Sequence, residues 1–319
     1  MSGIVSPGVY YDMPSDEYFA DPCPEPSLTQ SLAKVLIAHS PLHARQEHPR
    51  LKVEVDDEAD DEAEKYIKAK AIGNAAHKIM LGRGKEVAIV DAPDFKSKAA
   101  KDAGDDAAAA GHVIILRKHH LIAQRMVLSG AMQLDAIEGA ERAFKRDAGD
   151  GEVVIACKYR GVWLRQMLDW PTKDLREVWD YKTTGLSASP YETGKLMSSA
   201  GWNVQAAMTD IILGELDPEG AGRRRYFFVP HEQYSPFALS VCEVGEAALT
   251  IGRKKIEYAI DRWIECMSSR KWPAYPLRII RPELPEWDVN RWLAREVQEW
   301  DEREAAQPKS KILTNLAGG

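Results

Sequence analysis

The sequence predicts an α/β fold in which helices flank a central mixed β-sheet and helical embellishments surround that core. Between residues 152 and 182, β-branched and aromatic residues form runs separated by turn signals, as in consecutive strands. On both sides of this region, apolar residues recur at helical spacing. The chain has 319 residues and is 45% hydrophobic, which is enough for one substantial core.

The N-terminal part, about residues 1–135, is predicted to be mainly helical. Residues 1–26 are rich in Pro, Tyr and Asp and indicate extended turns, whereas SLTQSLAKVLIA (27–38) has a serine cap and helical apolar spacing. The run DDEADDEAE (56–64) carries seven carboxylates and indicates a solvated loop or a helix start. The remaining predicted elements are a helix ending near Gly82, a short strand in KEVAIVDAP, a helix or connector at 97–110 and a helix at 117–134.

The central part, about residues 150–270, is predicted to hold the sheet. Three strands at 152–158, 161–170 and 176–182 form a meander, which makes a mixed or antiparallel sheet. Helical spacing at 190–215, a strand at 223–230, a further strand in FALSVCEV and a long helix at 245–270 complete this part. With a tryptophan-rich tail at 271–319, we expect residues 1–319 to form a single domain.

Composition limits the classes of function. The net charge of −7 argues against a surface covered with phosphate-binding charge, although a local basic patch is enough for nucleic acid. The apolar runs are too short for a membrane span, and the N-terminus lacks the layout of a signal peptide. The four cysteines are widely scattered and form no CxxC pair, so we expect reduced thiols, no iron–sulfur cluster and a cytoplasmic location: Cys23, Cys157, Cys242 and Cys266.

Acidic residues and one lysine gather at strand ends. In VWDYKTTG (178–185), Asp180 and Lys182 are two residues apart on a strand and therefore share a face. Alone, this pair is a surface ion pair of little energetic value. Asp169 closes the preceding strand and Glu152 opens the first, so three carboxylates and a lysine can meet at one sheet edge. Such an oxygen set suits Mg²⁺ or Mn²⁺, and the lysine could orient or deprotonate a water or stabilise phosphate charge.

Several stretches resemble the PD-(D/E)xK nuclease superfamily and, within it, the RecE-type (exonuclease VIII) phage recombination nucleases. The resemblance is carried in chain order by GVYYDMPSDEYFADP, SLTQSLAKVLIAHSP, GNAAHKIML, GEVVIACKYRGVWLRQMLD, VWDYKTTG, WNVQAAMTD, KWPAYP and LPEW. It spans most of the chain, and it implies a restriction-endonuclease-like core.

The resemblance also implies roles for individual residues. Metal ligation falls to His77, Asp169 and Asp180, with the main-chain carbonyl of Tyr181 and one or two Mg²⁺ or Mn²⁺ ions. The catalytic set consists of Lys182, Asp180, Asp169, the accessory acid Glu152, and Gln205, which would fix the nucleophile side or the DNA end. Two departures from the family pattern are Met167-Leu168 before Asp169, which alters the shape of the strand end, and Trp202 in place of a tyrosine, which alters a stack against DNA.

Arginines are the candidate DNA contacts. Arg223, Arg224 and Arg225 form the strongest basic cluster, which is either a solvated strand start or a grip on the phosphate backbone. Arg160 and Arg165 are further candidates. Because Arg165 lies four residues before Asp169 on the same strand face, it is the better candidate for a phosphate clamp near the site.

The favoured function is that of a Mg²⁺-dependent exonuclease that degrades one strand of linear duplex DNA from an end. Polarity from 5′ to 3′, a RecT-type single-strand annealing partner and a ring-like homo-oligomer follow from the resemblance alone. Two alternatives stay open: a structure-specific or CRISPR-associated-type endonuclease on the same core, and a catalytically silent DNA-binding recombination module. No membrane partner is expected.

Overall fold

A computed structural model of the chain describes residues 3–53 and 64–306. The acidic run predicted to be a loop or helix start lies, at residues 56–63, outside these ranges. The chain divides into two compact units, Met1–Tyr275 and Pro276–Gly319. The second unit contains helix α10 (Glu286–Ala306), none of whose residues is buried, and the first unit contains all the other elements. No helix of the described ranges is long and apolar enough to cross a membrane.

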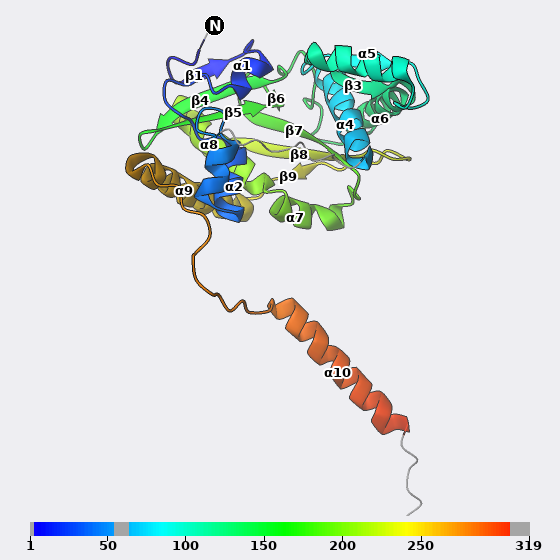
Figure 1. Cartoon of the computed structure of the whole chain (residues 1–319), viewed down its shortest axis with the longest axis vertical. Helices are drawn as coiled ribbons and strands as arrows, with labels where there is room; N and C mark the ends of the chain where they lie inside the picture. Colours follow the sequence, from blue (N-terminus) through cyan, green and yellow to red (C-terminus); the bar gives the residue numbers. More distant parts are fainter. Residues whose placement is uncertain (1–2, 54–63, 307–319) are drawn as a thin grey trace, which may run out of the picture. The chain divides into compact units, whose positions relative to one another are not determined.

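The core of the first unit is built on two adjoining sheets (Figure 1). The first is antiparallel, in the order β1-β4-β5, and the second is mixed, in the order β6-β7-β8-β9, with β7 and β8 parallel. These arrangements confirm the α/β prediction. The strands are β1 (Gly8–Tyr10), β4 (Val153–Tyr159), β5 (Val162–Leu168), β6 (Trp170–Pro171), β7 (Glu177–Thr184), β8 (Arg225–Glu232) and β9 (Cys242–Glu243).

The predicted three-strand meander needs a correction. Strands β4 and β5 pair antiparallel as expected, but β7 pairs with β6 and β8 in the second sheet. Asp169 separates β5 from β6 and interrupts the hydrogen-bond ladder with β7. In a regular ladder a main-chain carbonyl would accept the Tyr181 amide proton, but here the Asp169 side-chain Oδ2 accepts it at 2.9 Å. The break therefore places a carboxylate where the two sheets meet.

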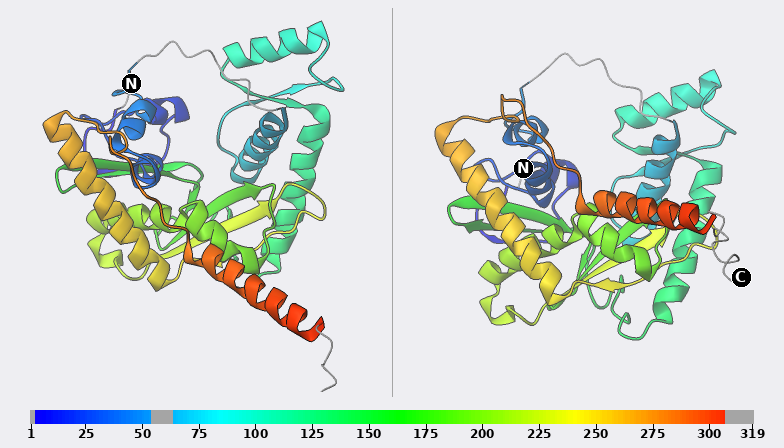
Figure 2. Two further views of the ribbon diagram at one scale, coloured as in Figure 1. Left: turned by 60° about the horizontal axis from the view of Figure 1, so that its bottom comes forward. Right: turned by 90° about the horizontal axis from the view of Figure 1, so that it is seen from below.

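Helices cover both faces of the second sheet, and the strand alternation shows which side chains face each layer. Val178 packs into the core beneath α2 (Gln30–Ala38), α8 (Trp202–Leu216) and α9 (Glu246–Ser269). Trp179 packs into a separate core beneath α4 (Glu64–Leu81) and α6 (Arg117–Asp135). Figure 2 shows α9 and α6 on opposite sides of the strands. Since successive residues alternate, the Val178 face also carries Asp180 and Lys182.

The outer parts of the first unit are short elements. Strands β2 (Val87–Val90) and β3 (Val113–Leu116) form a parallel pair bridged by α5 (Lys98–Ala109), in the region predicted to be helix or connector. The single helical region predicted at 190–215 is divided, because Gly201 adopts a left-handed φ of 62° before α8. The remaining short helices are α1 (Ser15–Phe19), α3 (Pro41–Glu47), α7 (Pro190–Ser199) and the 3₁₀ turn Pro218–Gly220.

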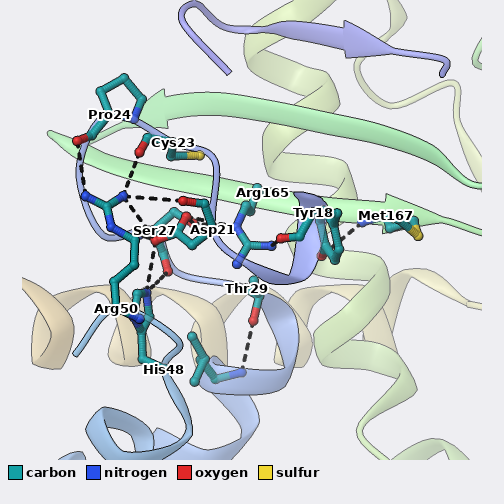
Figure 3. A network of polar contacts seen from close by, with 11 residues as sticks. Tyr18, Asp21, Cys23, Pro24, Ser27, Thr29, His48, Arg50, Arg165 and Met167 are labelled. Carbon is teal, nitrogen blue, oxygen red and sulfur yellow. Dashed lines mark hydrogen bonds and ion pairs between the residues drawn. The ribbon is translucent and has the colours of Figure 1, made fainter. Parts of the chain in front are cut away.

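A buried polar network anchors the N-terminal segment to β5 (Figure 3). Asp21 is 4% exposed and accepts hydrogen bonds from the Ser27 hydroxyl at 2.7 Å and from Arg165 Nε at 3.1 Å. His48 Nε2 lies 3.2 Å from the same carboxylate. Arg165 Nη1 also donates to the Tyr18 carbonyl at 2.7 Å. The network fixes the chain just before α2 against the strand that ends at the candidate site.

Candidate active site

Strand β7 supplies the two central side chains of the site. Asp180 is 4% exposed, and its Oδ1 forms an ion pair with Lys182 Nζ. The Lys182 ammonium also lies 5.9 Å from the Phe228 ring centroid, over a neighbouring strand. The prediction that this pair shares a face is confirmed, and the buried Asp180 pairs with a Lys182 side chain that is 32% exposed.

Asp169 and His77 approach this pair from two other elements. Asp169 stands at the β5–β6 break, and its Oδ2 lies 3.3 Å from His77 Nε2 on α4. His77 Nδ1 faces Glu152 Oε1 at 3.9 Å, and Glu152 Oε2 accepts a hydrogen bond from Ser15 at 3.3 Å. Residues that are distant in the sequence therefore converge on one polar cluster, as predicted for these side chains.

Helix α8 contributes Gln205 to the cluster. Gln205 is buried and donates from Nε2 to Asp180 Oδ2. The Tyr181 amide binds Asp169, while its ring is buried and its hydroxyl pairs with His231 Nδ1 at 2.8 Å. Asp180 is thus held on one oxygen by an amide and on the other by an ammonium.

The carboxylates and their partners have displaced pKa values. Burial and the negative charge of Asp169 raise the pKa of Asp180 to about 6, against the opposing effect of Lys182. Burial opposes ionisation of Asp169, but the charge and hydrogen bond of His77 lower its pKa overall. Burial would lower the pKa of Lys182, but Asp180 and Asp169 raise it, so the amine keeps its proton at neutral pH. Asp169 likewise raises the pKa of His77 despite burial.

The side chains of the cluster are of the types that bind a hard divalent cation, but among the described residues no group of three or more His, Cys, Asp or Glu is arranged to hold a metal ion. Asp180 Oδ1 is buried and receives no hydrogen bond, only the ion pair with Lys182. Burial and, after it, the negative charge of Asp169 raise the pKa of Asp180, and a bound cation would favour the ionised form. Asp169, Asp180 and His77 would hold Mg²⁺ or Mn²⁺ only after rearrangement, because Lys182 pairs with Asp180 and His77 pairs with Asp169.

Lys34 joins the site without having been predicted. It lies on α2, its stem packs against Gly201, and a Cβ on that glycine would sit 2.9 Å from Lys34 Cε. Burial and the nearby charge of Lys182 lower the pKa of Lys34 to about 8. Helical spacing places Lys34 beside buried positions of α2, but only the fold brings that helix to β7.

Two of the predicted DNA contacts are wrong because the guanidinium groups are buried inside the protein. Arg165 is 2% exposed and is bound by Asp21, Ser27 and Tyr18, so it cannot clamp a phosphate. Arg224 is 8% exposed, and its Nη2 lies 2.7 Å from Asp217.

The three other arginines are accessible. Arg160 pairs with Glu257 and Asp261, Arg225 forms two 2.9 Å bonds with Glu243, and Arg223 donates to a main-chain carbonyl. Arg225 is the first residue of β8 and lies opposite Glu177. The residue opposite Asp180 comes three positions later in β8, so Arg225 lies roughly 10 Å along the strand from that position. They remain candidate DNA contacts.

Trp202 does not face DNA. It is buried and stacks on Phe228 with ring centroids 4.9 Å apart and an interplanar angle of 9°. The predicted change in a stack against DNA is therefore wrong: the indole belongs to the core beneath α8.

Comparisons with known proteins agree with this fold. No protein-family model matches the chain, and no curated protein matches it in sequence. Among solved structures, the chain is similar to the crystal structure of a "putative exonuclease" from Eubacterium rectale, with a TM-score of 0.54 and 11% sequence identity. The match covers 87% of this chain and 98% of that chain. At this identity the match shows a shared fold.

Proposed function

We propose that this protein is a metal-dependent nuclease that hydrolyses phosphodiester bonds of DNA. The observation that carries the proposal is the convergence of Asp169, Asp180, Lys182 and His77 on one partly buried cluster. Carboxylates with displaced pKa values beside a partly buried lysine indicate a candidate functional site. The fold shared with a chain described as a "putative exonuclease" supports the same proposal.

Each side chain has a role that its surroundings favour. A bound divalent cation would activate a water and neutralise phosphate charge. Lys182 is held protonated by Asp180 and Asp169, so it acts as a positive donor that orients the water or the phosphate oxygens, rather than as a base. Gln205 fixes the Asp180 carboxylate through Oδ2, and His77 fixes Asp169 in the same way.

The finer assignment rests on the resemblance to RecE-type nucleases. We propose an exonuclease that degrades one strand of linear duplex from 5′ to 3′, leaving single strand for a RecT-type annealing partner. A ring-like homo-oligomer around the DNA accompanies this assignment. The competing functions are an endonuclease on the same core and a silent DNA-binding module, and the intact acid and lysine set speaks against the second.

A direct assay separates these functions. Wild-type protein is incubated with linear and with covalently closed duplex in Mg²⁺ or Mn²⁺, beside Asp180→Asn and Lys182→Met. We expect loss of linear duplex only, and at least a 1000-fold loss of rate in both variants, on the scale of lost metal and electrostatic catalysis. Asp174→Asn, at an exposed carboxylate in the β6–β7 turn, is the matched control.

Three outcomes count against the assignment. Cutting of closed circles favours the endonuclease. Equal inactivity of wild type and variants, with DNA binding retained, favours the silent module. Full activity of Asp180→Asn removes the proposed site altogether.

A further inference from the structure

The loop between α4 and β2 carries cationic side chains directly beside the candidate site. Its sequence is Gly-Arg-Gly-Lys, residues 82–85. Gly84 has a φ of 111°, and a Cβ there would lie 3.1 Å from Glu152 Oε1 and 3.8 Å from His77 Nδ1. The main chain of the loop therefore passes against two residues of the site, an approach that requires glycine on both steric and conformational grounds.

Other contacts hold this loop in place. Lys78 on α4 donates to the Gly84 carbonyl at 3.2 Å and to Glu86 at 2.6 Å. The stem of Arg83 lies on Gly151, where an added Cβ would sit 3.0 Å from Arg83 Cγ. The main chain of the loop is thus fixed to the segment that carries Glu152.

A third cation comes from the segment that precedes β4. A Cβ on Gly82, which has a φ of 68°, would lie 2.7 Å from Arg146 Nη2, so the Arg146 guanidinium lies over the start of the loop. Arg83, Lys85 and Arg146 are all exposed. Within the described ranges, no hydrogen bond or ion pair engages the side chains of Lys85 and Arg146. Arg83 pairs only with Asp12, which is 82% exposed, at 3.0 Å. An exposed pair of this kind is weak and easily exchanged.

We propose that Arg83, Lys85 and Arg146, termed here the loop cluster, bind backbone phosphates of the DNA strand that enters the candidate site. The inference rests on the proposed nuclease function. Phosphate is the ligand that suits this surface, because all three cations are exposed, only Arg83 has a partner, the exposed Asp12, and the loop main chain at Gly84 lies against Glu152 and His77. Sequence-independent contacts of this kind position a duplex without reading its bases.

The test is DNA binding without turnover. Fluorescence anisotropy of a labelled linear duplex in EDTA gives the Kd of wild type and of an Arg83→Ala/Lys85→Ala/Arg146→Ala variant at several salt concentrations. We expect the variant to raise Kd at least tenfold and to reduce the slope of log Kd against log salt by up to about 2.7, for three phosphate contacts at about 0.9 each. A Lys254→Ala/Lys271→Ala variant removes two exposed lysines on or just after α9 and should leave both quantities unchanged.

Charge-preserving variants guard against a folding artefact. Arg83→Lys/Lys85→Arg/Arg146→Lys should restore most of the affinity and the salt slope, and thermal unfolding checks that each variant is folded. The proposal is overturned if the alanine variant binds like wild type, if it binds no worse than the α9 control, or if the charge-preserving variant fails to restore affinity while folded. Cleavage by wild type is scored separately: absence of metal-dependent cleavage removes the proposed nuclease function, whereas the loop cluster is judged on anisotropy alone.

Discussion

Replacing Asp21 with asparagine would leave the buried Arg165 guanidinium without its charged partner. The Asp21 side chain is wholly buried, and it binds Arg165, Ser27 and His48 at once (Figure 3). Asparagine preserves the shape but removes the charge. Removal of one member of a buried ion pair typically costs 3–5 kcal/mol of folding free energy, because the remaining charge stays desolvated.

The pKa of Asp21 gives an independent magnitude. Burial alone would raise it, but the hydrogen bond from His48, the charge of Arg165 and hydrogen bonds from Ser27 lower it from 3.8 to about 2. That difference corresponds to about 2.5 kcal/mol of stability at neutral pH. Together with lost hydrogen bonds, we expect Asp21→Asn to lose about 3 kcal/mol, which lowers Tm by roughly 6 °C for a chain of this size.

The dependence on pH distinguishes charge from shape. A carboxyl group whose pKa is lowered by folding contributes stability above its unfolded pKa of 3.8, and that contribution is lost as pH falls through the folded value of about 2. The charge-dependent part of the stability difference between wild type and Asp21→Asn should therefore fall at pH 3 to about half of its value at pH 7. Urea unfolding of wild type and Asp21→Asn at pH 7 and pH 3 measures it, with Asp135→Asn at an exposed ion pair as control. The reasoning would be refuted if Asp21→Asn were as stable as wild type, or if the difference between their free energies of unfolding did not depend on pH.

Three further predictions concern the site. Because the pKa of Asp180 is about 6, cleavage at limiting Mg²⁺ should fall about tenfold per pH unit below pH 6 in a pH–rate profile; a flat profile to pH 5 contradicts this. Gln205→Leu should raise the Mg²⁺ concentration for half-maximal activity roughly 10–100-fold, and an unchanged metal titration would show that the amide does not position Asp180. Lys34→Met should raise KM for DNA about fivefold, which corresponds to about 1 kcal/mol of lost attraction to phosphate. Steady-state kinetics measure this, and an unaltered KM would contradict a role of Lys34 in binding DNA.

The sequence was most informative where a local pattern decides the structure. The run around residues 152–182 has strand propensity throughout, and the observed β4, β5 and β7 lie within two residues of the predicted bounds. Alternation along a strand was enough to place Asp180 and Lys182 together. The partner of β7 could not be predicted, because pairing with β6 and β8 depends on the break at Asp169 and on a strand more than forty residues later.

Exposure was the harder property to predict. Every residue of β5 except Met167 is buried, so alternation along that strand does not separate a solvent face from a core face. Arg165 resembles a strand-end cation in sequence, but the segment from Tyr18 to Ser27 folds over it and supplies Asp21. The same long-range packing brings Lys34 into the site. Neither placement leaves a local signal, because the covering element and the covered residue are far apart in the chain.

The distribution of charge explains how an acidic chain could bind a polyanion. Arg160 and Arg225 are each paired with nearby carboxylates, and Arg165 is buried and paired with Asp21. In the described ranges Lys85 and Arg146 have no such partner, Arg83 pairs only with the exposed Asp12, and Lys34 feels the charges of Asp180 and Lys182. A local group of cations makes the surrounding potential positive even when the net charge is −7. DNA binding should therefore depend on salt, and neutralising Arg160 or Arg225 should weaken DNA binding much less than neutralising the loop cluster.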